Sequence, residues 1–473
     1  MLACCVNWGY KRRRPPVQKK LLSGLFWVLL ANLLVKPLWL LGIEVGVQNA
    51  VGNEAYGFYF AVFNLSYILN ILLDLGITNF NTRNIAQHPQ LISKHLSGIL
   101  GIKLCLLGLY VVVTFTVGAL LGYGSREFHL LAWLCLAQAL NSLILYLRSN
   151  FEGLLLFRWD SLFSVLDRVL MILICGSLLW GPFSVRNSEF RIEHFVYAQV
   201  AAYALTALLA LVVIGRKARL RRLRFDWRFF FVILKKSAPF ALLVLLMASY
   251  NRLDPILLRR LASDADAGIY AGAFRLLDAL TMVCYLVSVP LLPVFSKILG
   301  RMEVSRRNAQ SIDLQPGASD LQDSLRLVFW PMMLFVVGSA VACSLLANPL
   351  MHLLYHDGAV PYVPVFRVLI FGLVPIGITY VFGTLLTAGG RLRQLNMLAT
   401  ITLALNLVTN LLLIPRLGAV GSAWAALLAQ SFMAMTQLLL AVRLYHLPPA
   451  AFRLPRPSAI RTLVALLKAD PEE

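Results

Sequence analysis

Long apolar runs separated by short polar stretches follow one another along the whole chain. A helix that crosses a bilayer needs about 20 mostly apolar residues, and the sequence contains twelve runs of that kind. The predicted spans are 24–43, 55–77, 97–121, 129–150, 161–180, 194–215, 237–261, 268–298, 324–348, 363–387, 394–414 and 418–442. The pattern therefore predicts an all-α polytopic membrane protein with about twelve transmembrane helices.

A weak internal repeat indicates that the chain has two similar halves. The segment 268–276, GIYAGAFRL, aligns with 57–65, GFYFAVFNL, and shares its Gly, Tyr, Phe and Leu at an offset of 211 residues. With six spans in each half, both halves would begin on the same side of the membrane. We therefore predict two six-helix bundles related by a parallel pseudo-two-fold axis, with the substrate path between them.

The predicted organisation follows from these spans. It consists of a basic arm at 1–23, an N-terminal bundle at 24–215, a basic interfacial linker at 216–236, a C-terminal bundle at 237–442 and a tail at 443–473. The linker mixes arginines with aromatic residues, which is typical of a segment lying on an anionic membrane surface. We expect it to bind anionic lipid headgroups.

Composition and charge support the membrane assignment and exclude other classes. Hydrophobic residues make up 59% of the chain and the mean hydropathy is +0.75, whereas a soluble domain has about 45–50% apolar residues. The net charge of +21 is also typical of nucleic-acid-binding proteins, but one side's tails and loops hold 30 Lys and Arg residues and the opposite loops seven. This positive-inside bias predicts that both termini lie in the cytoplasm, and it leaves no reason to expect a nucleic-acid partner.

The cysteines give no sign of a metal or cofactor site. Five of the seven fall within predicted spans, and Cys4 and Cys5 lie in the basic arm. None has the spacing of a metal site or the context of a disulfide. We therefore expect no metal and no cofactor.

Charged residues inside the predicted spans point to a polar cavity. Nine of them are Lys36, Glu44, Lys103, Asp167, Arg168, Arg252, Asp254, Arg275 and Asp278. At roughly 2.5–3.5 kcal/mol each, the set would cost on the order of 25 kcal/mol if it faced lipid. A water-filled cavity lined by these charges removes most of that cost.

The first predicted span combines a buried cation with a proline. Pro37 follows Lys36 and frees the carbonyl group of Leu33, so we expect the helix to bend near its middle. A bend beside a buried charge suits a gate that moves. The alternative is a tolerated kink, with the lysine side chain reaching toward the interface.

Two acids occupy equivalent places in the repeat. Glu44 lies 13 residues before Gly57 in the first span, and Asp254 lies 14 residues before Gly268 in the seventh. Asp254 is followed by Pro255, which should break the helix there. Both acids are candidates for gating or ion coupling. For Asp254, the alternative is an ion pair with an arginine of the seventh or eighth span.

Further polar residues lie at the ends and on the faces of the spans. Asp74 ends the second span near the cytoplasmic interface, where it serves either a gate or the helix end, and Lys103 is close enough to reach the same interface. Asp278 shares one face of the eighth span with Arg275 and Tyr285, and it completes the candidate gating set. A polar stripe on the eleventh span consists of Thr402, Asn406, Thr409 and Asn410.

Several short motifs occur in a fixed order along nearly the whole chain. They are Glu54-x-Tyr56-Gly57-x-Tyr59, Asp74-x-Gly76 followed by Arg83, Asp254, Tyr270 with Arg275, and Asn406 to Gly421 (N-x-x-x-N-x-x-x-x-P-x-x-G-x-x-G). This series resembles that of bacterial polysaccharide flippases, the O-antigen flippases among them. The resemblance implies the fold of multidrug and toxic compound extrusion (MATE) transporters. It also implies export of an undecaprenyl-diphosphate-linked oligosaccharide from the inner to the outer leaflet.

The resemblance further implies a cationic central cavity, for which Lys36 and Arg275 are the best matches and Arg252 a weaker one. It places the chain in the bacterial inner membrane as a multi-pass protein working by alternating access. Its cargo would serve surface polysaccharide or lipopolysaccharide biosynthesis. The polysaccharide polymerase machinery would then be a candidate partner.

Two other functions fit a polytopic membrane protein. A drug or solute exporter of the same fold would need a cavity rich in acids and aromatic groups to hold lipophilic cations, whereas the predicted cavity is rich in basic residues. A membrane-embedded polysaccharide polymerase or ligase would carry catalytic residues on a large external loop. The longest external loop predicted here, 181–193, has about 13 residues. We therefore expect a transporter that is not an enzyme and has no catalytic residues.

Overall fold

The computed structural model describes residues 34–78, 81, 82, 85, 92–154, 156–181, 190–216, 227–288, 291–308, 316–355 and 358–452. Within these ranges every regular element is a helix, so the predicted all-α class is confirmed. The arm 1–23, the start of the first predicted span, part of the linker 216–236 and the end of the tail 443–473 lie outside the described residues.

The helices form two groups that follow the two halves of the chain. Those of the N-terminal half are η1 (Trp39–Glu44), α2 (Val45–Ile68), η2 (Leu69–Leu73), α4 (Ile92–Leu120), α5 (Ser125–Gly153), α6 (Phe157–Phe163), α7 (Leu166–Trp180) and α8 (Ile192–Gly215). Those of the C-terminal half are α9 (Trp227–Arg252), α10 (Asp254–Leu261), α11 (Asp264–Ser288), α12 (Leu291–Asn308), α13 (Pro316–Leu345), α14 (Ala347–Tyr355), α15 (Tyr362–Ile370), α16 (Leu373–Ala388), α17 (Leu392–Tyr445) and η5 (Pro449–Phe452).

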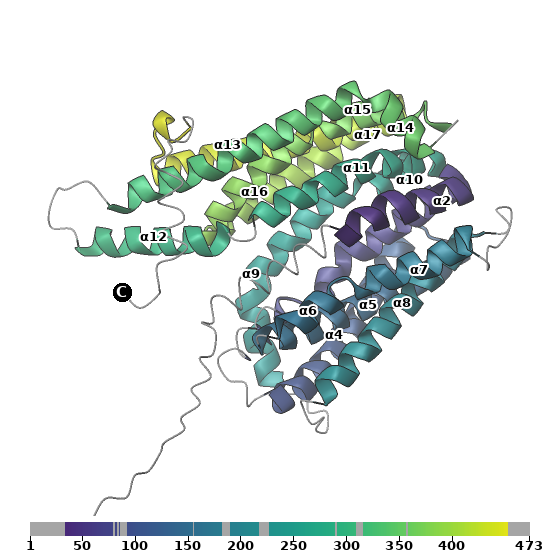
Figure 1. Cartoon of the computed structure of the whole chain (residues 1–473), viewed down its shortest axis with the longest axis horizontal. Helices are drawn as coiled ribbons and strands as arrows, with labels where there is room; N and C mark the ends of the chain where they lie inside the picture. Colours follow the sequence, from purple (N-terminus) through teal and green to yellow (C-terminus); the bar gives the residue numbers. More distant parts are fainter. Residues whose placement is uncertain are drawn as a thin grey trace, which may run out of the picture.

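The two groups lie on opposite sides of the molecule, with α2 and α11 at the boundary between them (Figure 1). They meet at the end that carries α10 and α14. Toward the opposite end α12 and α13 lie apart from α4 and α6, and α9 runs between the two groups.

The long helix α17 turns back on itself at a glycine. Gly418 has φ +54°, in the left-handed region that favours glycine. Ser422 Oγ donates to Asn410 Oδ1 at 3.0 Å, although these residues would lie about 18 Å apart in a straight helix. The chain therefore reverses at Gly418, where the sequence predicts a tight turn.

The same reversal occurs within α2 at Gly52, where φ is +80°. Trp39 and Tyr59 would lie about 30 Å apart in one straight helix. Their rings nevertheless both pack against Phe195, with centroid distances of 5.8 and 5.4 Å. Nine helices of the described residues are long and apolar enough to cross a membrane, or ten if the bent pair α9 and α10 forms one span. The hairpins at Gly52 and Gly418 are each counted as one helix but cover two of the predicted spans. The exact number of crossings therefore stays a prediction.

The halves approach each other most closely where α2 crosses α11. A Cβ atom on Gly57 would collide with the main-chain oxygen of Asp264, and one on Gly268 would collide with that of Asn53. Adding the offset of 211 converts residues 57 and 53 into 268 and 264. The two contacts are therefore one contact repeated about a two-fold axis, as the predicted internal repeat requires.

The predicted break at Pro255 occurs, and the predicted bend at Pro37 stays a prediction. Helix α9 ends at Arg252 and α10 begins at Asp254, directly before Pro255, with a bend of 43°. Two residues after Pro37, the first helix widens into the π-helical segment η1. Such segments interrupt the regular main-chain hydrogen bonding and often occur at functional sites.

Candidate functional site

Arg275 on α11 lies in the contact between the halves and is 4% exposed. Its Nε is 3.4 Å from Glu44 Oε2, its Nη1 donates to the hydroxyl of Tyr355 at 2.9 Å, and its guanidinium lies 4.4 Å from the ring centre of Tyr56. Nε and Nη2 make no hydrogen bond, so the pair with Glu44 is a charge contact. Burial raises the pKa of Tyr355 on α14, although Arg275 opposes this, and the Tyr355 hydroxyl donates to the Gly272 carbonyl at 3.2 Å.

The structure does not bring Lys36 and Arg275 together. Glu44, which holds Arg275, follows Lys36 by eight residues, or about 12 Å along a helix axis. Residues on opposite walls of a cavity can be this far apart, so a shared cationic cavity stays a prediction. A substrate-binding role for Arg275 stays a prediction.

Lys36 is half-buried and forms no ion pair or hydrogen bond with any part of the chain that the structure describes. The charged groups that act on it are those of Arg168, Asp167, Arg148 and Asp278. Arg168 on α7 lies over the ring of Trp39 at 5.4 Å. Arg168 Nε also lies 3.6 Å from Asp167 Oδ2, so Arg168 forms an ion pair and shares the surroundings of Lys36.

Arg252, at the end of α9, contributes a further cation on the C-terminal side. Its Nη2 lies 3.5 Å from Asp278 Oδ1, and both side chains are partly exposed. The guanidinium also lies 5.2 Å from the ring centres of Tyr67 on α2 and Phe274 on α11. Arg252 therefore touches both halves, and Asp278, predicted as a gating acid, is its partner.

Asp254 is 1% exposed and is held only by neutral groups. Its Oδ2 accepts from the hydroxyl of Tyr270 at 2.9 Å, and its Oδ1 accepts from the amides of Asn406 at 3.1 Å and Asn410 at 2.8 Å. None of the described Lys or Arg side chains forms an ion pair with it, which removes the predicted alternative of a pair with Arg252 or Arg275. Asn406 and Asn410, in the polar stripe of the eleventh span, therefore face Asp254 of the seventh span. The sequence did not show this contact.

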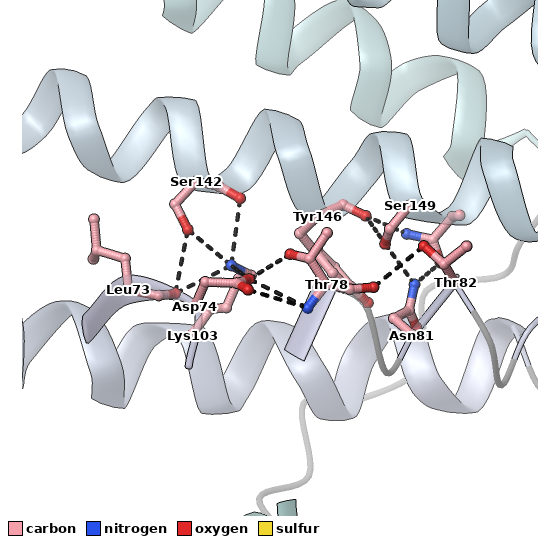
Figure 2. A network of polar contacts seen from close by, with 10 residues as sticks. Leu73, Asp74, Thr78, Asn81, Thr82, Lys103, Ser142, Tyr146 and Ser149 are labelled. Carbon is pink, nitrogen blue, oxygen red and sulfur yellow. Dashed lines mark hydrogen bonds and ion pairs between the residues drawn. The ribbon is translucent and has the colours of Figure 1, made fainter. Parts of the chain in front are cut away.

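Asp74 follows η2 directly and pairs with Lys103 of α4 (Figure 2). Lys103 Nζ lies 3.2 Å from Asp74 Oδ1 and donates to the Leu73 carbonyl at 3.1 Å and to Ser142 Oγ at 2.8 Å. The carboxylate also accepts from the hydroxyl and the main-chain amide of Thr78. Lys103 is 8% exposed and pairs with Asp74, which the sequence placed near the cytoplasmic interface. Lys103 belongs to α4, and its acceptors come from η2, from Asp74 directly after it and from α5. The ammonium group is therefore satisfied inside the bundle, and its contacts join these three helices.

Another set of charges joins the halves at the predicted external end. Arg259 of α10 donates from Nη2 to Glu127 Oε1 at 2.6 Å and from Nε to Asp264 Oδ1 at 2.8 Å. The guanidinium groups of Arg259 and Arg126 lie 4.7 and 4.6 Å from the ring centre of Phe58. Sequence analysis missed this cluster because Glu127 and Arg259 are 132 residues apart and no local motif connects them.

Amide contacts close the same end. Gln48 Nε2 donates to the Gly268 carbonyl at 2.8 Å and to the hydroxyl of Tyr362 at 3.0 Å. Asn49 Nδ2 donates to the Leu354 carbonyl at 2.8 Å. These donors come from the first helical hairpin and their acceptors from the C-terminal half, so the halves are tied together there.

Solved structures place this fold in a known class. A mutant form of a MATE transporter of Vibrio cholerae superposes with a TM-score of 0.59 at 16% identity, covering 92% of this chain and 99% of that one. An inward-facing multidrug resistance MATE family transporter gives 0.63 at 14% identity, with coverages of 91% and 98%. The lipid II flippase MurJ in an inward closed conformation gives 0.63 at 14% identity, with coverages of 95% and 91%. The protein is therefore a multi-pass membrane protein with the MATE-type fold.

The sequence adds the family. The model of the polysaccharide biosynthesis protein family matches residues 21–299, more than half of the chain, and the chain belongs to that family. Curated protein sequences contain no match to it. The resemblance to a polysaccharide family with a MATE-type fold is confirmed.

Proposed function

We propose that the protein moves undecaprenyl-diphosphate-linked oligosaccharide from the cytoplasmic to the outer leaflet of the bacterial inner membrane, and that it catalyses no chemical reaction. The observation that carries this proposal is Lys36, a cation in the membrane interior that has no acid partner among the described residues. Family membership supports the saccharide part of the cargo.

A diphosphate fits the surroundings of Lys36. An unpaired charge inside a membrane protein costs roughly 2.5–3.5 kcal/mol, and a bound anion would offset that cost. Lys36 would act as a point charge, whereas Arg168 and Arg252 can each offer two parallel N–H groups to phosphate oxygens. Arg252 can do so if its long contact of 3.5 Å to Asp278 opens.

The same charges disfavour export of cationic drugs, the main alternative for this fold. A lipophilic cation would meet the positive charges of Lys36 and Arg168, while the nearby acids Asp167 and Asp278 already pair with Arg168 and Arg252. Repulsion between like charges is strong where water is scarce. The balance of charge around Lys36 therefore favours an anionic cargo.

Alternating access is supported by where the halves touch. The contacts of Gln48, Asn49 and Arg259 lie at the end predicted to be external, and at the opposite end α12 and α13 lie apart from α4 and α6 (Figure 1). Opening the external end requires breaking the pair between Arg259 and Glu127. We assign the conformation seen here to the cytoplasm-facing side of such a cycle.

The proposal is tested by measuring lipid-linked oligosaccharide on the outer leaflet of cells that carry single variants. Lys36→Ala should lower export at least about tenfold, and Lys36→Arg should retain part of it, because the positive charge remains. Lys297→Ala is the matched control, since Lys297 is also a half-buried lysine but lies on α12. Normal export by Lys36→Ala at wild-type protein abundance would contradict the proposal.

A further inference from the structure

A pocket with both polar and apolar walls opens between η2 and α5 in the N-terminal half. Its volume is about 260 Å³, and it is lined by Asn70, Asp74, Thr78, Gln138, Asn141 and Ser142 together with Ile71 and Leu145. Clefts for drug-sized ligands measure about 300–1,000 Å³, so this pocket suits a smaller group such as a single sugar ring. None of the charges predicted to bind the diphosphate lines it.

The chemistry of the lining matches sugar hydroxyl groups. Asp74 and Lys103 neutralise each other at the wall of the pocket, and the other polar groups are amides and hydroxyls (Figure 2). Amides and hydroxyls provide both donors and acceptors, as each sugar hydroxyl does. A sugar ring combines hydroxyl groups with apolar C–H faces, so a neutral sugar suits these amides, hydroxyls and the side chains of Ile71 and Leu145 better than a phosphate does.

Part of this hydrogen-bonding capacity is unused. Asn141 makes no hydrogen bond to any described residue, and Gln138 makes only a long one, accepting from Asn70 Nδ2 at 3.5 Å. Amides at this depth need water or a ligand, because lipid offers them no partner. A ligand with several hydroxyl groups would satisfy them.

The pocket lies next to the cations proposed for the diphosphate. Tyr67 touches the guanidinium of Arg252, and Asn70 is one helical turn further along the same face. Leu73 and Asp74 continue this path toward the predicted cytoplasmic side. If the diphosphate of the cargo lies near Arg252, the sugar joined to it would therefore reach the pocket. The lipid tail would stay at the level of the cations.

We propose that this pocket binds a neutral sugar unit of the cargo, close to the diphosphate, before the cargo crosses the membrane. The inference rests on the proposed function and deepens it, because it assigns the recognition of sugar to the N-terminal half. Asn70, Gln138 and Asn141 are the specificity-determining residues.

The test uses the cargo that the cell itself supplies. A photo-crosslinking amino acid is placed at Leu145, which lines the pocket, and its adducts are identified by mass spectrometry. The matched control is Leu136, which is similarly exposed, at 43% against 44%, but lies nine residues away on the opposite face of α5. A third position, Tyr67, reports on the diphosphate region. Saccharide-bearing adducts at Leu145 and none at Leu136 are expected.

The possible outcomes separate this inference from the proposed function. If Tyr67 captures lipid-linked saccharide and Leu145 captures only phospholipid, the sugar pocket is wrong and the flippase proposal stands. If no position captures a lipid-linked saccharide, both are wrong.

Substitutions provide the second arm. Asn141→Leu and Asn70→Leu should weaken binding of the cell's lipid-linked oligosaccharide to the purified protein about tenfold, because sugar hydroxyls lose their partners. Binding of undecaprenyl diphosphate without sugar should not change, and this also shows that the variants are folded. If the variants weaken the binding of both lipids equally, or weaken the binding of neither, the assignment of this pocket to sugar is wrong.

Discussion

Glu44 and Asp254 hold equivalent places in the two halves by sequence, but the structure gives them opposite surroundings. Glu44 lies 3.4 Å from the guanidinium of Arg275, and it also accepts from Trp39 Nε1 at 3.0 Å. Asp254 is more deeply buried and accepts only from one hydroxyl and two amides. One acid has a permanent cation beside it, and the other has none among the described residues.

This difference separates a structural acid from a coupling acid. If Glu44 took up a proton, Arg275 would keep only the hydroxyl of Tyr355 and the ring of Tyr56, and the loss of its carboxylate neighbour opposes that protonation. Asp254 has no such partner to lose, so it can take up a proton or a small cation more easily. We therefore favour Asp254 over Glu44 for ion coupling, although the sequence assigned that role to both.

The largest effect is expected for Arg275→Met, which leaves the Glu44 carboxylate without its cation. Breaking a buried pair in this way costs about 3–5 kcal/mol of folding free energy. Since Glu44 is 20% exposed, we expect the lower end of that range, about 3 kcal/mol. Unfolding of the purified protein in detergent measures the loss.

The control for this variant combines Arg275→Met with Glu44→Gln. Both charges are then absent, and most of the lost stability should return. A single Arg275→Met variant as stable as the wild type would show that Glu44 does not depend on this arginine.

For Asp254→Asn we expect an intermediate loss of stability and the loss of ion coupling. The new amide brings a donor toward the donors of Asn406 and Asn410, at a cost of about 1–3 kcal/mol. The variant cannot exchange a proton or neutralise a cation. Export in membrane vesicles should therefore lose its dependence on imposed proton and sodium gradients. An unchanged dependence on both gradients would rule out the coupling role.

The smallest effect is expected for Glu44→Gln. The amide oxygen still accepts from Trp39, and Arg275 keeps the hydroxyl of Tyr355 and the ring of Tyr56. We expect a loss of about 1 kcal/mol and an unchanged response to ion gradients in the same vesicle assay. If this variant loses the response and Asp254→Asn keeps it, the roles of the two acids are reversed.

The sequence predicted well where the chain bends and turns. The break before Pro255 and the reversal at Gly418 occur where these residue types indicated them. The offset of 211 between Gly57 and Gly268 also reappears, as the symmetric crossing of α2 and α11. These features depend on the missing N–H of proline and the missing Cβ of glycine, which act whatever the distant partners are.

The pairing of charges was predicted less well. The sequence assigned Arg275 to a cationic cavity and Lys103 to the cytoplasmic interface, but it did not indicate that their partners are Glu44 and Asp74. Hydropathy shows that such a charge is inside a span. It does not show which helix lies opposite, and therefore which charges meet.

The sequence by itself determined the all-α membrane class, the family and the residues at which helices break, because these depend on apolar length and on local backbone chemistry. Only the tertiary structure decided that Asp254 faces the amides of Asn406 and Asn410, that Glu127 meets Arg259, and that amides gather beside Asp74. Such contacts join segments far apart in the chain, and the rotation of each helix against its neighbours is fixed only when the halves pack together.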